Sequence, residues 1–458
     1  MNSVSSQVTS PSVLAERVAR LREQPVPATD KALGWLTAAG PVTAAGLAAV
    51  RPSLWDFELP VMVLHDSALT HNIQAMAAYC AAAGVSHAPH GKTTMAPQLI
   101  ARQLAAGAWA VSAATAAQAR VYRAFGVPRV LIASQLTRPE AVQWVGRELA
   151  ADPGFECYTY ADSLAGVALL DDALRADPSP ARPAPSGRPL PVLVELGYPG
   201  GRTGCRSLDE ALAVAAAVHA ADSLELAGAA GFEGGLERAG LDATLAAVTD
   251  FIINLRTLGE RLPGFGDGTG RRPILSAGGS SYFDVVSREL ASADARAVLR
   301  SGAYIAHDHG HYAESGPASR PALPGVPPSP QFAPALELWT AVLSVPEPGL
   351  AIVNAGRRDI SCDQGMPVPL RVRRSGVTEP AAGMRLTNLD DQHGYLSITG
   401  SITGSITRSI TGSVTGPLAP GDLVSLGSTH PCTTMDKWQS IPVVDDDDHV
   451  IDAVHTFF

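Results

Sequence analysis

The chain of 458 residues has few cysteines and few charged residues. Its five cysteines are odd in number and far apart, so they do not form the disulfide framework of a small secreted domain, and we expect a reducing compartment. Only 17% of the residues are charged and 46% are hydrophobic, which excludes a disordered chain. The net charge of −10 argues against a nucleic-acid partner, because a polyanion would be repelled.

Segments typical of export or membrane insertion are also lacking. The first twenty residues are polar, and no apolar segment follows a basic start, so we expect no export signal. The longest apolar stretch, at 104–119, is rich in Ala and interrupted by Ser, Thr and Gln. It falls short of the ~20 strongly apolar residues of a membrane span. We therefore expect a cytoplasmic protein without a membrane partner.

Strand-like apolar runs recur through the first two thirds of the chain, and each is followed by a helix-like stretch. The runs are residues 85–89, 109–113, 129–133, 155–160, 191–196, 225–230, 273–276 and 303–306. Eight such units predict an α/β fold, a (β/α)8 TIM-type barrel. A doubly wound open sheet is the alternative that periodicity alone leaves open.

The last third of the chain has a different pattern. Short alternating strands at 342–345, 350–354 and 423–426 lie among Gly, Pro and Asp turns, which predicts an all-β domain. Within it, residues 397–416 repeat a tetrad five times, as SITG-SITG-SITR-SITG-SVTG. We interpret this repeat as a loop insert without chemistry and the acidic run at 445–448 as a solvated turn.

These patterns divide the chain into four parts. The predicted parts are an N-terminal extension partly packed on the β domain (1–58), a cofactor-binding barrel (59–316), a Pro-rich linker (317–335) and a β domain with a metal site (336–458). A second Pro-rich stretch, at 178–191, lies within the barrel and is interpreted as a surface loop.

A lysine follows the first predicted barrel strand, in the segment His90-Gly91-Lys92-Thr93-Thr94. Functional groups of such barrels gather where the strands end and the βα loops begin. A lysine at the mouth of a barrel, flanked by small residues, can serve as a Schiff-base nucleophile. An ordinary surface lysine is the alternative.

Two glycine-rich segments follow later barrel strands. The segment 197–204 (Gly-Tyr-Pro-Gly-Gly-Arg-Thr-Gly) lets a ligand approach the backbone, and its Arg202 can face an anion. The segment 276–281 (Ser-Ala-Gly-Gly-Ser-Ser) predicts a phosphate cradle of free backbone N–H groups and hydroxyls. Each could be a plain turn, but a lysine and a phosphate loop together indicate pyridoxal 5′-phosphate (PLP).

Candidate metal ligands stand near the C-terminus, in His430-Pro431-Cys432. An imidazole and a thiolate at this spacing suit a borderline-soft ion such as zinc, and two protein ligands leave the open coordination of a catalytic ion. The run His-Asp-His-Gly-His at 307–311 also allows a metal site, but we favour a loop or supporting role for it and for His393.

Taken in order, 89–93, 201–204, 276–279 and 430–432 resemble the D-serine dehydratase and D-threonine aldolase-like family of fold-type III PLP enzymes. The segments 232–234, 391–394 and 421–422 resemble that family's pattern too. The resemblance implies an alanine-racemase-like barrel with a C-terminal β domain, assembled as a homodimer. Gly91 and the Thr-Thr-Met run after Lys92 depart from the commoner motif.

The resemblance also implies roles for the candidate residues. Lys92 would hold the cofactor as a Schiff base, and Arg202 would face the oxygen of the cofactor ring. His430 and Cys432 would bind zinc. The residues implied to contact the cofactor are Lys92, Arg202, Thr203, Gly278, Gly279 and Ser280.

Within this family the second metal ligand separates two activities. A carboxylate resembles the aldolases and a cysteine resembles the zinc-dependent dehydratases, so Cys432 implies a dehydratase. The expected reaction removes water from a D-β-hydroxy amino acid and gives an α-keto acid and ammonia. The alternative is a metal-dependent D-threonine or 3-hydroxy-D-aspartate aldolase, which gives glycine and an aldehyde. A third possibility is a non-catalytic PLP-binding protein.

Overall fold

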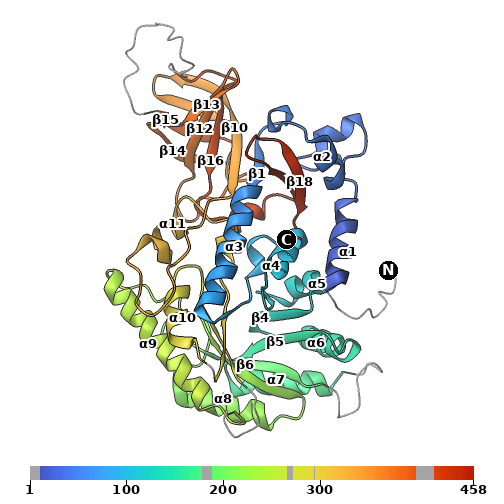
Figure 1. Ribbon diagram of the computed structural model, residues 1–458, viewed down its shortest axis with the longest axis vertical. Helices are drawn as coiled ribbons and strands as arrows, with labels where there is room; N and C mark the ends of the chain where they lie inside the picture. Colours follow the sequence, from blue (N-terminus) through green and yellow to red (C-terminus); the bar gives the residue numbers. More distant parts are fainter. Residues whose placement is uncertain (1–10, 178–187, 266–271, 293, 399–416) are drawn as a thin grey trace.

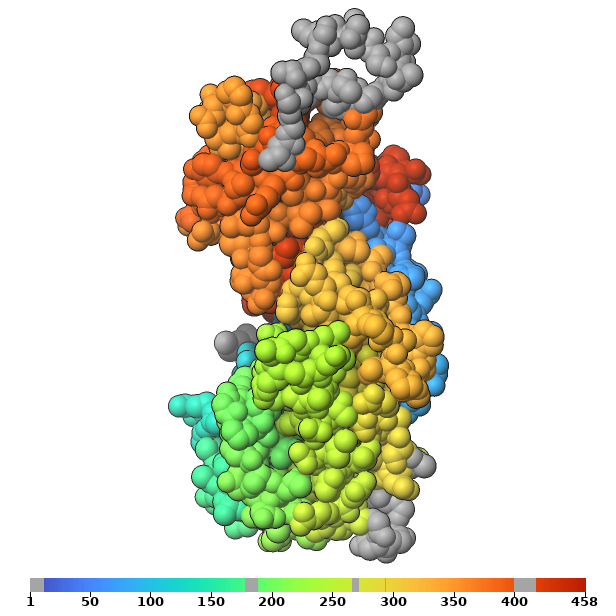
Figure 2. Space-filling view, turned by 90° about the vertical axis from the view of Figure 1, so that its left-hand side faces the viewer, coloured from blue at the N-terminus to red at the C-terminus, as the bar shows by residue number. Residues whose placement is uncertain are grey.

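The computed structural model describes residues 11–177, 188–265, 272–292, 294–398 and 417–458. They form a barrel and a β domain, shown one above the other in Figure 1. Figure 2 shows the same two parts from the side, with the chain that follows the barrel lying along their junction. Nearly all of the tetrad repeat and most of the Pro-rich loop predicted at 178–191 lie outside the described residues.

Eight parallel strands form the barrel, in the order β2-β9-β8-β7-β6-β5-β4-β3. They are β2 (Ser86–His87), β3 (Val111–Ala113), β4 (Arg129–Gln135), β5 (Glu156–Ala161), β6 (Leu190–Leu196), β7 (Leu224–Gly231), β8 (Ile274–Ala277) and β9 (Arg296–Leu299). The two outer strands also meet, because Ser112 N–H donates to the Pro89 carbonyl at 2.9 Å and His90 bridges to Ser112. The sheet is therefore curled into a barrel, which confirms the predicted fold class.

The eighth strand is not where the sequence pattern placed it. Residues 303–306 were expected to be a strand, but they begin a 3-10 helix, η4 (Ala303–Ile305), and the strand is β9. Val298 and Leu299 of β9 are fully buried and lie in register with Ser276 and Ala277 of β8. The run at 303–306 is apolar because η4 is itself buried, and a short apolar run looks the same in a strand and in a buried turn.

Helices cover the outside of the barrel (Figure 1). They are α3 (Asp66–Ala83), α4 (Pro97–Ala105), α5 (Ala116–Ala124), α6 (Pro139–Ala151), α7 (Leu164–Arg175), α8 (Leu208–Ala220), α9 (Leu241–Glu260) and α10 (Phe283–Leu290). The hydroxyls of Thr115, Ser163 and Ser207 cap three of them at the N-terminus. Gly84 ends α3 in a left-handed conformation (φ 68°), which glycine adopts without strain.

The β domain is a mostly antiparallel sheet in which the path β13-β12-β16-β10-β1-β17-β18 is extended by β11, β15 and β14. Its strands are β1 (Val61–His65), β10 (Leu336–Glu347), β11 (Leu350–Val353), β12 (Val368–Arg374), β13 (Val377–Pro380), β14 (Met384–Leu389), β15 (Gly394–Ile398), β16 (Leu423–Gly427), β17 (Ser440–Val444) and β18 (Val450–His455). All three strands predicted in this part of the chain are present.

One strand of this sheet comes from the other end of the sequence. We expected residues 59–65 to open the barrel domain, but β1 lies between β10 and β17 of the β domain. Val61 pairs with Trp339 of β10, and Leu64 pairs with Val443 of β17. The residues from Val61 to Leu64 are all buried, as a central strand requires. The chain thus contributes β1 to the β domain before it enters the barrel through α3.

The N-terminal extension contacts both domains. It contains α1 (Pro11–Arg22), η1 (Gly34–Ala39), α2 (Ala44–Val50) and η2 (Leu54–Asp56). Arg17 donates to the Ala124 carbonyl at the end of α5 at 2.6 Å, and Arg22 pairs with Asp452 of β18 at 3.1 Å. Among the described residues, no helix is both long and apolar enough to cross a bilayer.

Candidate active site

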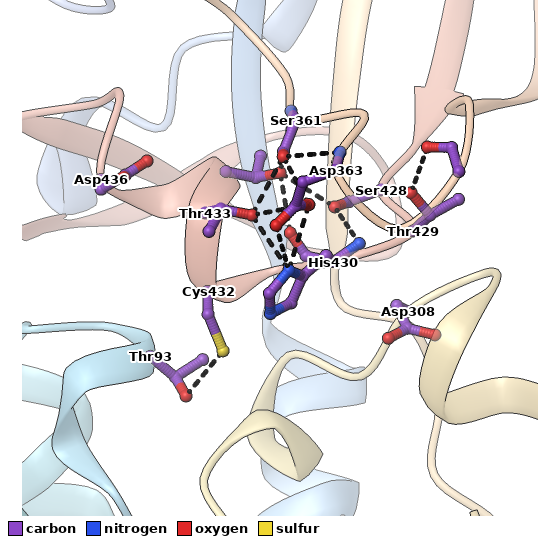
Figure 3. Close-up of polar contacts among 12 residues, drawn as sticks. Thr93, Asp308, Ser361, Asp363, Ser428, Thr429, His430, Cys432, Thr433 and Asp436 are labelled. Carbon is purple, nitrogen blue, oxygen red and sulfur yellow. Dashed lines mark hydrogen bonds and ion pairs between the residues drawn. The ribbon is translucent and has the colours of Figure 1, made fainter. Parts of the chain in front are cut away.

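The segment with Lys92 meets the segment with Cys432 where the two domains face each other. Lys92 lies in η3 (Gly91–Thr93), which is separated from the end of β2 by three residues, and Cys432 begins α12 (Cys432–Met435), after β16. The Thr93 Oγ1 atom lies 3.2 Å from the Cys432 sulfur, as Figure 3 shows. The side chain next to Lys92 therefore contacts the predicted metal pair directly.

Glycine at position 91 has a steric reason. A Cβ atom added to Gly91 would lie 2.5 Å from the Tyr122 hydroxyl oxygen, which is too close for any side chain. Tyr122 is buried in the barrel wall, and its hydroxyl donates to the Met95 sulfur at 3.1 Å. Gly91 departs from the commoner family motif, and in this chain the Tyr122 side chain fills the space that a larger residue at position 91 would need. Lys92 itself is exposed at the barrel mouth.

Three positively charged side chains surround His90. Burial lowers the pKa of His90 well below its usual value, and the charges of Lys92, Arg300 and Arg202 lower it further. The ring is therefore neutral, and its Nδ1 atom is buried without a hydrogen-bond partner in the described part of the chain. Lys92 and Arg202, which are far apart in the sequence, thus lie at the same end of the barrel.

Arg300 was missed by the sequence analysis. It is buried and donates to the Ser276 hydroxyl at 2.7 Å and to the Gly231 carbonyl at 2.6 Å. It directly follows β9, the strand that the pattern placed at 303–306, so the misplaced strand hid a cation at its carboxyl end. Had the strand been placed at 296–299, the arginine directly after it would have stood out as a candidate site residue.

The predicted phosphate cradle already holds an anionic side chain. The Gly278 N–H donates to Glu233 Oε2 at 3.1 Å, and the Gly279 N–H donates to Glu233 Oε1 at 2.6 Å. Glu233 is fully buried. The expectation that these two amides are free is therefore wrong, although their geometry does bind an anion. Ser280 lies differently, because it lines a cavity of about 380 Å³ whose lining includes neither Lys92 nor Arg202.

Arg202 and Thr203 are neighbours in the sequence, but their side chains point to different surroundings. The Arg202 side chain is exposed, and its guanidinium lies 4.7 Å from the ring centre of Phe232. The Thr203 hydroxyl instead donates to Glu195 Oε1 at 3.1 Å, inside the protein. Burial raises the pKa of Glu195. Arg202 is thus placed to meet a ligand, whereas the Thr203 hydroxyl is engaged by a buried carboxyl.

His430 is held by a carboxylate that the sequence analysis did not single out. Its Nδ1 atom lies 2.9 Å and 3.1 Å from the two oxygens of Asp363. Burial opposes the charge of the ring, but the neighbouring Cys432 sulfur and the Asp363 carboxylate outweigh it and raise the pKa of His430 to about 9. The imidazole and the thiol of this pair are donors that zinc prefers, so they fit such an ion.

Further ligands for a metal do not converge on this pair. Among the described residues, no group of three His, Cys, Asp or Glu side chains is arranged to hold a metal ion. An ion bound by His430 and Cys432 would therefore complete its coordination with water or substrate, as a catalytic ion does.

The histidine-rich run at 307–311 is a helix start. Asp308 is buried and accepts hydrogen bonds from the N–H groups of Gly310, Tyr312 and Ala313 at 3.0–3.1 Å, so its carboxylate holds the first turn of α11 (His311–Ser315). Burial lowers the pKa of both His307 and His309. His393, for which a loop or supporting role was expected, lies exposed in the turn before β15, and its carbonyl accepts from the Asp390 N–H at 2.8 Å.

Comparisons with known proteins match both halves of the chain. The family described as "Alanine racemase, N-terminal domain" matches residues 64–263, and the family described as "Putative serine dehydratase domain" matches residues 335–444. The 3-hydroxy-D-aspartate aldolase of Paracoccus denitrificans (strain Pd 1222) is 26% identical over 327 residues, which cover 68% of this chain and 75% of that protein.

Solved structures show the same architecture. D-threonine aldolase from Filomicrobium marinum matches with a TM-score of 0.66 and 23% identity, over 88% of this chain and 95% of that chain. D-threo-3-hydroxyaspartate dehydratase from Delftia sp. HT23 matches with a TM-score of 0.65 and 20% identity, over 88% of this chain and 99% of that chain.

The closed parallel barrel, the appended β domain and the lysine at their junction define an alanine-racemase-like protein of fold type III. The chain belongs to the D-serine dehydratase and D-threonine aldolase-like family of PLP enzymes, as the resemblance implied. Members of this family use PLP and often a metal, and the relatives of this chain are lyases.

Proposed function

We propose that the protein is a PLP- and zinc-dependent D-amino acid dehydratase, similar to D-serine ammonia-lyase. The observation that carries this proposal is the contact between Thr93 and Cys432, which brings the segment of the candidate Schiff-base lysine to the candidate metal pair. A base and a metal site this close together suit a reaction at two adjacent carbon atoms of one substrate, Cα and Cβ. The proposed protein is a cytoplasmic homodimer that acts on a small D-amino acid.

The residues at the barrel mouth fit PLP. Lys92 offers an exposed amine and Arg202 an exposed guanidinium at the same end of the barrel, and Ser280 adds a half-buried hydroxyl in the loop after β8. Bound PLP would supply an electron sink for the negative charge that forms at the substrate Cα atom. In this proposal the Lys92 Nζ atom, once released from the cofactor, takes the proton from Cα as general base.

The metal pair accounts for the departure of the β-hydroxyl. Hydroxide is a poor leaving group, and a zinc ion held by His430 and Cys432 would supply the Lewis acid that assists its departure. The Nδ1 atom of His430 already faces Asp363, so Nε2 remains to bind the ion. Because Glu233 accepts the N–H groups of Gly278 and Gly279, Ser280 is the residue of this loop that would hold the cofactor phosphate.

A metal-dependent aldolase is the second candidate, favoured by the aldolases among the relatives. The same groups could hold a β-alkoxide and cleave the Cα–Cβ bond, giving glycine and an aldehyde. The cysteine at position 432 favours elimination, since a carboxylate at this position is the aldolase feature of the family.

Product analysis tests the proposal. Protein loaded with PLP and zinc is incubated separately with D-serine, D-threonine and 3-hydroxy-D-aspartate. Ammonia together with an α-keto acid is the expected outcome. Glycine with an aldehyde would replace the dehydratase by the aldolase, and no turnover of any of the three would favour a non-catalytic PLP-binding protein.

A further inference from the structure

Asp363 lies in the loop between β11 and β12, far in the sequence from His430 and Thr433, which it contacts. Its two carboxylate oxygens lie 3.1 Å and 2.9 Å from the Nδ1 atom of His430. Thr433, one residue after Cys432, donates to Asp363 Oδ1 at 3.0 Å. Figure 3 shows the carboxylate on one side of the imidazole ring and Cys432 on the other.

The carboxylate is itself held in place. The Ser361 hydroxyl donates to Asp363 Oδ1 at 2.7 Å, and the Ser361 N–H donates to the Thr434 hydroxyl at 3.2 Å. The Thr434 hydroxyl in turn donates to the His430 carbonyl at 3.0 Å. The loop that carries Asp363 is thus tied to the start of α12, and the distance between Asp363 and the ring cannot change freely.

An acceptor on Nδ1 decides which nitrogen of a neutral imidazole carries the proton. A carboxylate there keeps the proton on Nδ1 and leaves the lone pair on Nε2, and it also fixes the rotation of the ring. We propose that Asp363 is a positioning residue that sets the tautomer and orientation of His430, so that Nε2 and the Cys432 sulfur face one metal ion. This inference rests on the proposed zinc role of the pair.

Metal affinity tests the assignment without reference to turnover. The variant Asp363→Asn keeps the shape of the side chain but removes its charge and half of its accepting capacity. We expect it to bind zinc about 10- to 100-fold more weakly than the wild type in competition with a chelating dye, as for other outer-shell carboxylates. The variant Asp363→Glu keeps the carboxylate and is expected to recover part of the loss.

Asp436→Asn is the matched control. Asp436 is an exposed carboxylate that directly follows α12 and pairs with Lys437 at 3.9 Å. The Asp436→Asn variant loses the same charge from the same region as Asp363→Asn, so its zinc affinity should equal that of the wild type. A loss equal to that of Asp363→Asn would mean that general electrostatics, and not the contact to Nδ1, sets the affinity, and would overturn the assignment.

Cobalt(II) in place of zinc separates positioning from direct ligation. The sulfur-to-cobalt absorption band should appear in Asp363→Asn at saturating cobalt with the same shape as in the wild type, because His430 and Cys432 remain the ligands. A changed band at saturation would make Asp363 a ligand and overturn the positioning role. Equal zinc affinity of wild type and Asp363→Asn would overturn it too, whereas a wild type that binds no metal would overturn the proposed zinc function itself.

Discussion

The Glu233 carboxylate accepts the N–H of Gly279 at 2.6 Å and occupies the turn in which the sequence predicted a phosphate. Gly278 donates to the same carboxylate from the adjacent amide. Two successive N–H groups that point at one carboxylate form an anion-binding turn, so its conformation depends on a side chain from the loop after β7.

Replacing Glu233 by Gln tests this dependence. The amide nitrogen of Gln cannot accept a hydrogen bond, so one buried N–H loses its partner, which costs about 1–3 kcal/mol in the free energy of unfolding. Urea unfolding measures the loss. Glu237→Gln changes an exposed glutamate of the same loop and should leave the stability unchanged. Equal stabilities of wild type and Glu233→Gln would mean that the carboxylate does not support the turn.

Lys92→Ala should remove the visible absorbance that PLP acquires when it forms a Schiff base with the protein. The chain has only two other lysines. Lys31 Nζ is paired with Asp359 at 2.6 Å, and Lys437 lies 3.9 Å from Asp436. Lys437→Ala is therefore the matched control and should keep the absorbance. If the band survives in Lys92→Ala, the cofactor is anchored at another amine.

Cys432→Ala should lose metal and elimination activity but keep the Schiff-base absorbance, because the sulfur is a proposed metal ligand and not a cofactor contact. Elemental analysis and the absorption spectrum of the same sample measure the two properties. Cys362→Ala alters another half-buried cysteine and should change neither. Full activity of Cys432→Ala in the presence of a chelator would refute the role of zinc.

Acid should destabilise the β domain through Glu337. Burial favours the neutral acid, but hydrogen bonds from His65 (2.7 Å) and Arg371 (3.0 Å) outweigh it and lower the pKa of Glu337 to about 2. The unfolded chain, with a pKa of about 4.3, binds the proton first as the pH falls. The stabilisation is therefore complete above about pH 5 and is lost between about pH 5 and 2, by up to ~3 kcal/mol.

Unfolding free energies measured from pH 6 to pH 2.5 test this dependence. The variant Glu337→Gln should lose less stability over that range than the wild type, since it has no proton to bind. Glu347→Gln, at the exposed end of the same strand, should follow the wild type. Parallel curves for wild type and Glu337→Gln would contradict the lowered pKa.

Sequence periodicity predicted the eight repeated strand–helix units and the β domain, but it left an open sheet possible and did not place every boundary. The eighth strand was misplaced because η4 is as apolar as the true strand β9, and both are buried. The strand at 61–65 was assigned to the wrong domain because its partners, β10 and β17, lie almost 300 and 400 residues away. Alternation along a strand reports its burial and carries no information on its neighbours.

By itself, the sequence determined which residues could do chemistry here. A lysine after a barrel strand, an arginine among glycines and a His-x-Cys pair are local patterns, and their chemistry follows from residue type. Only the tertiary structure decided which groups meet: Thr93 with Cys432, Glu233 with Gly279, Asp363 with His430. The physical reason is that these contacts join residues 46 to 339 positions apart, and folding, not spacing along the chain, sets their distances.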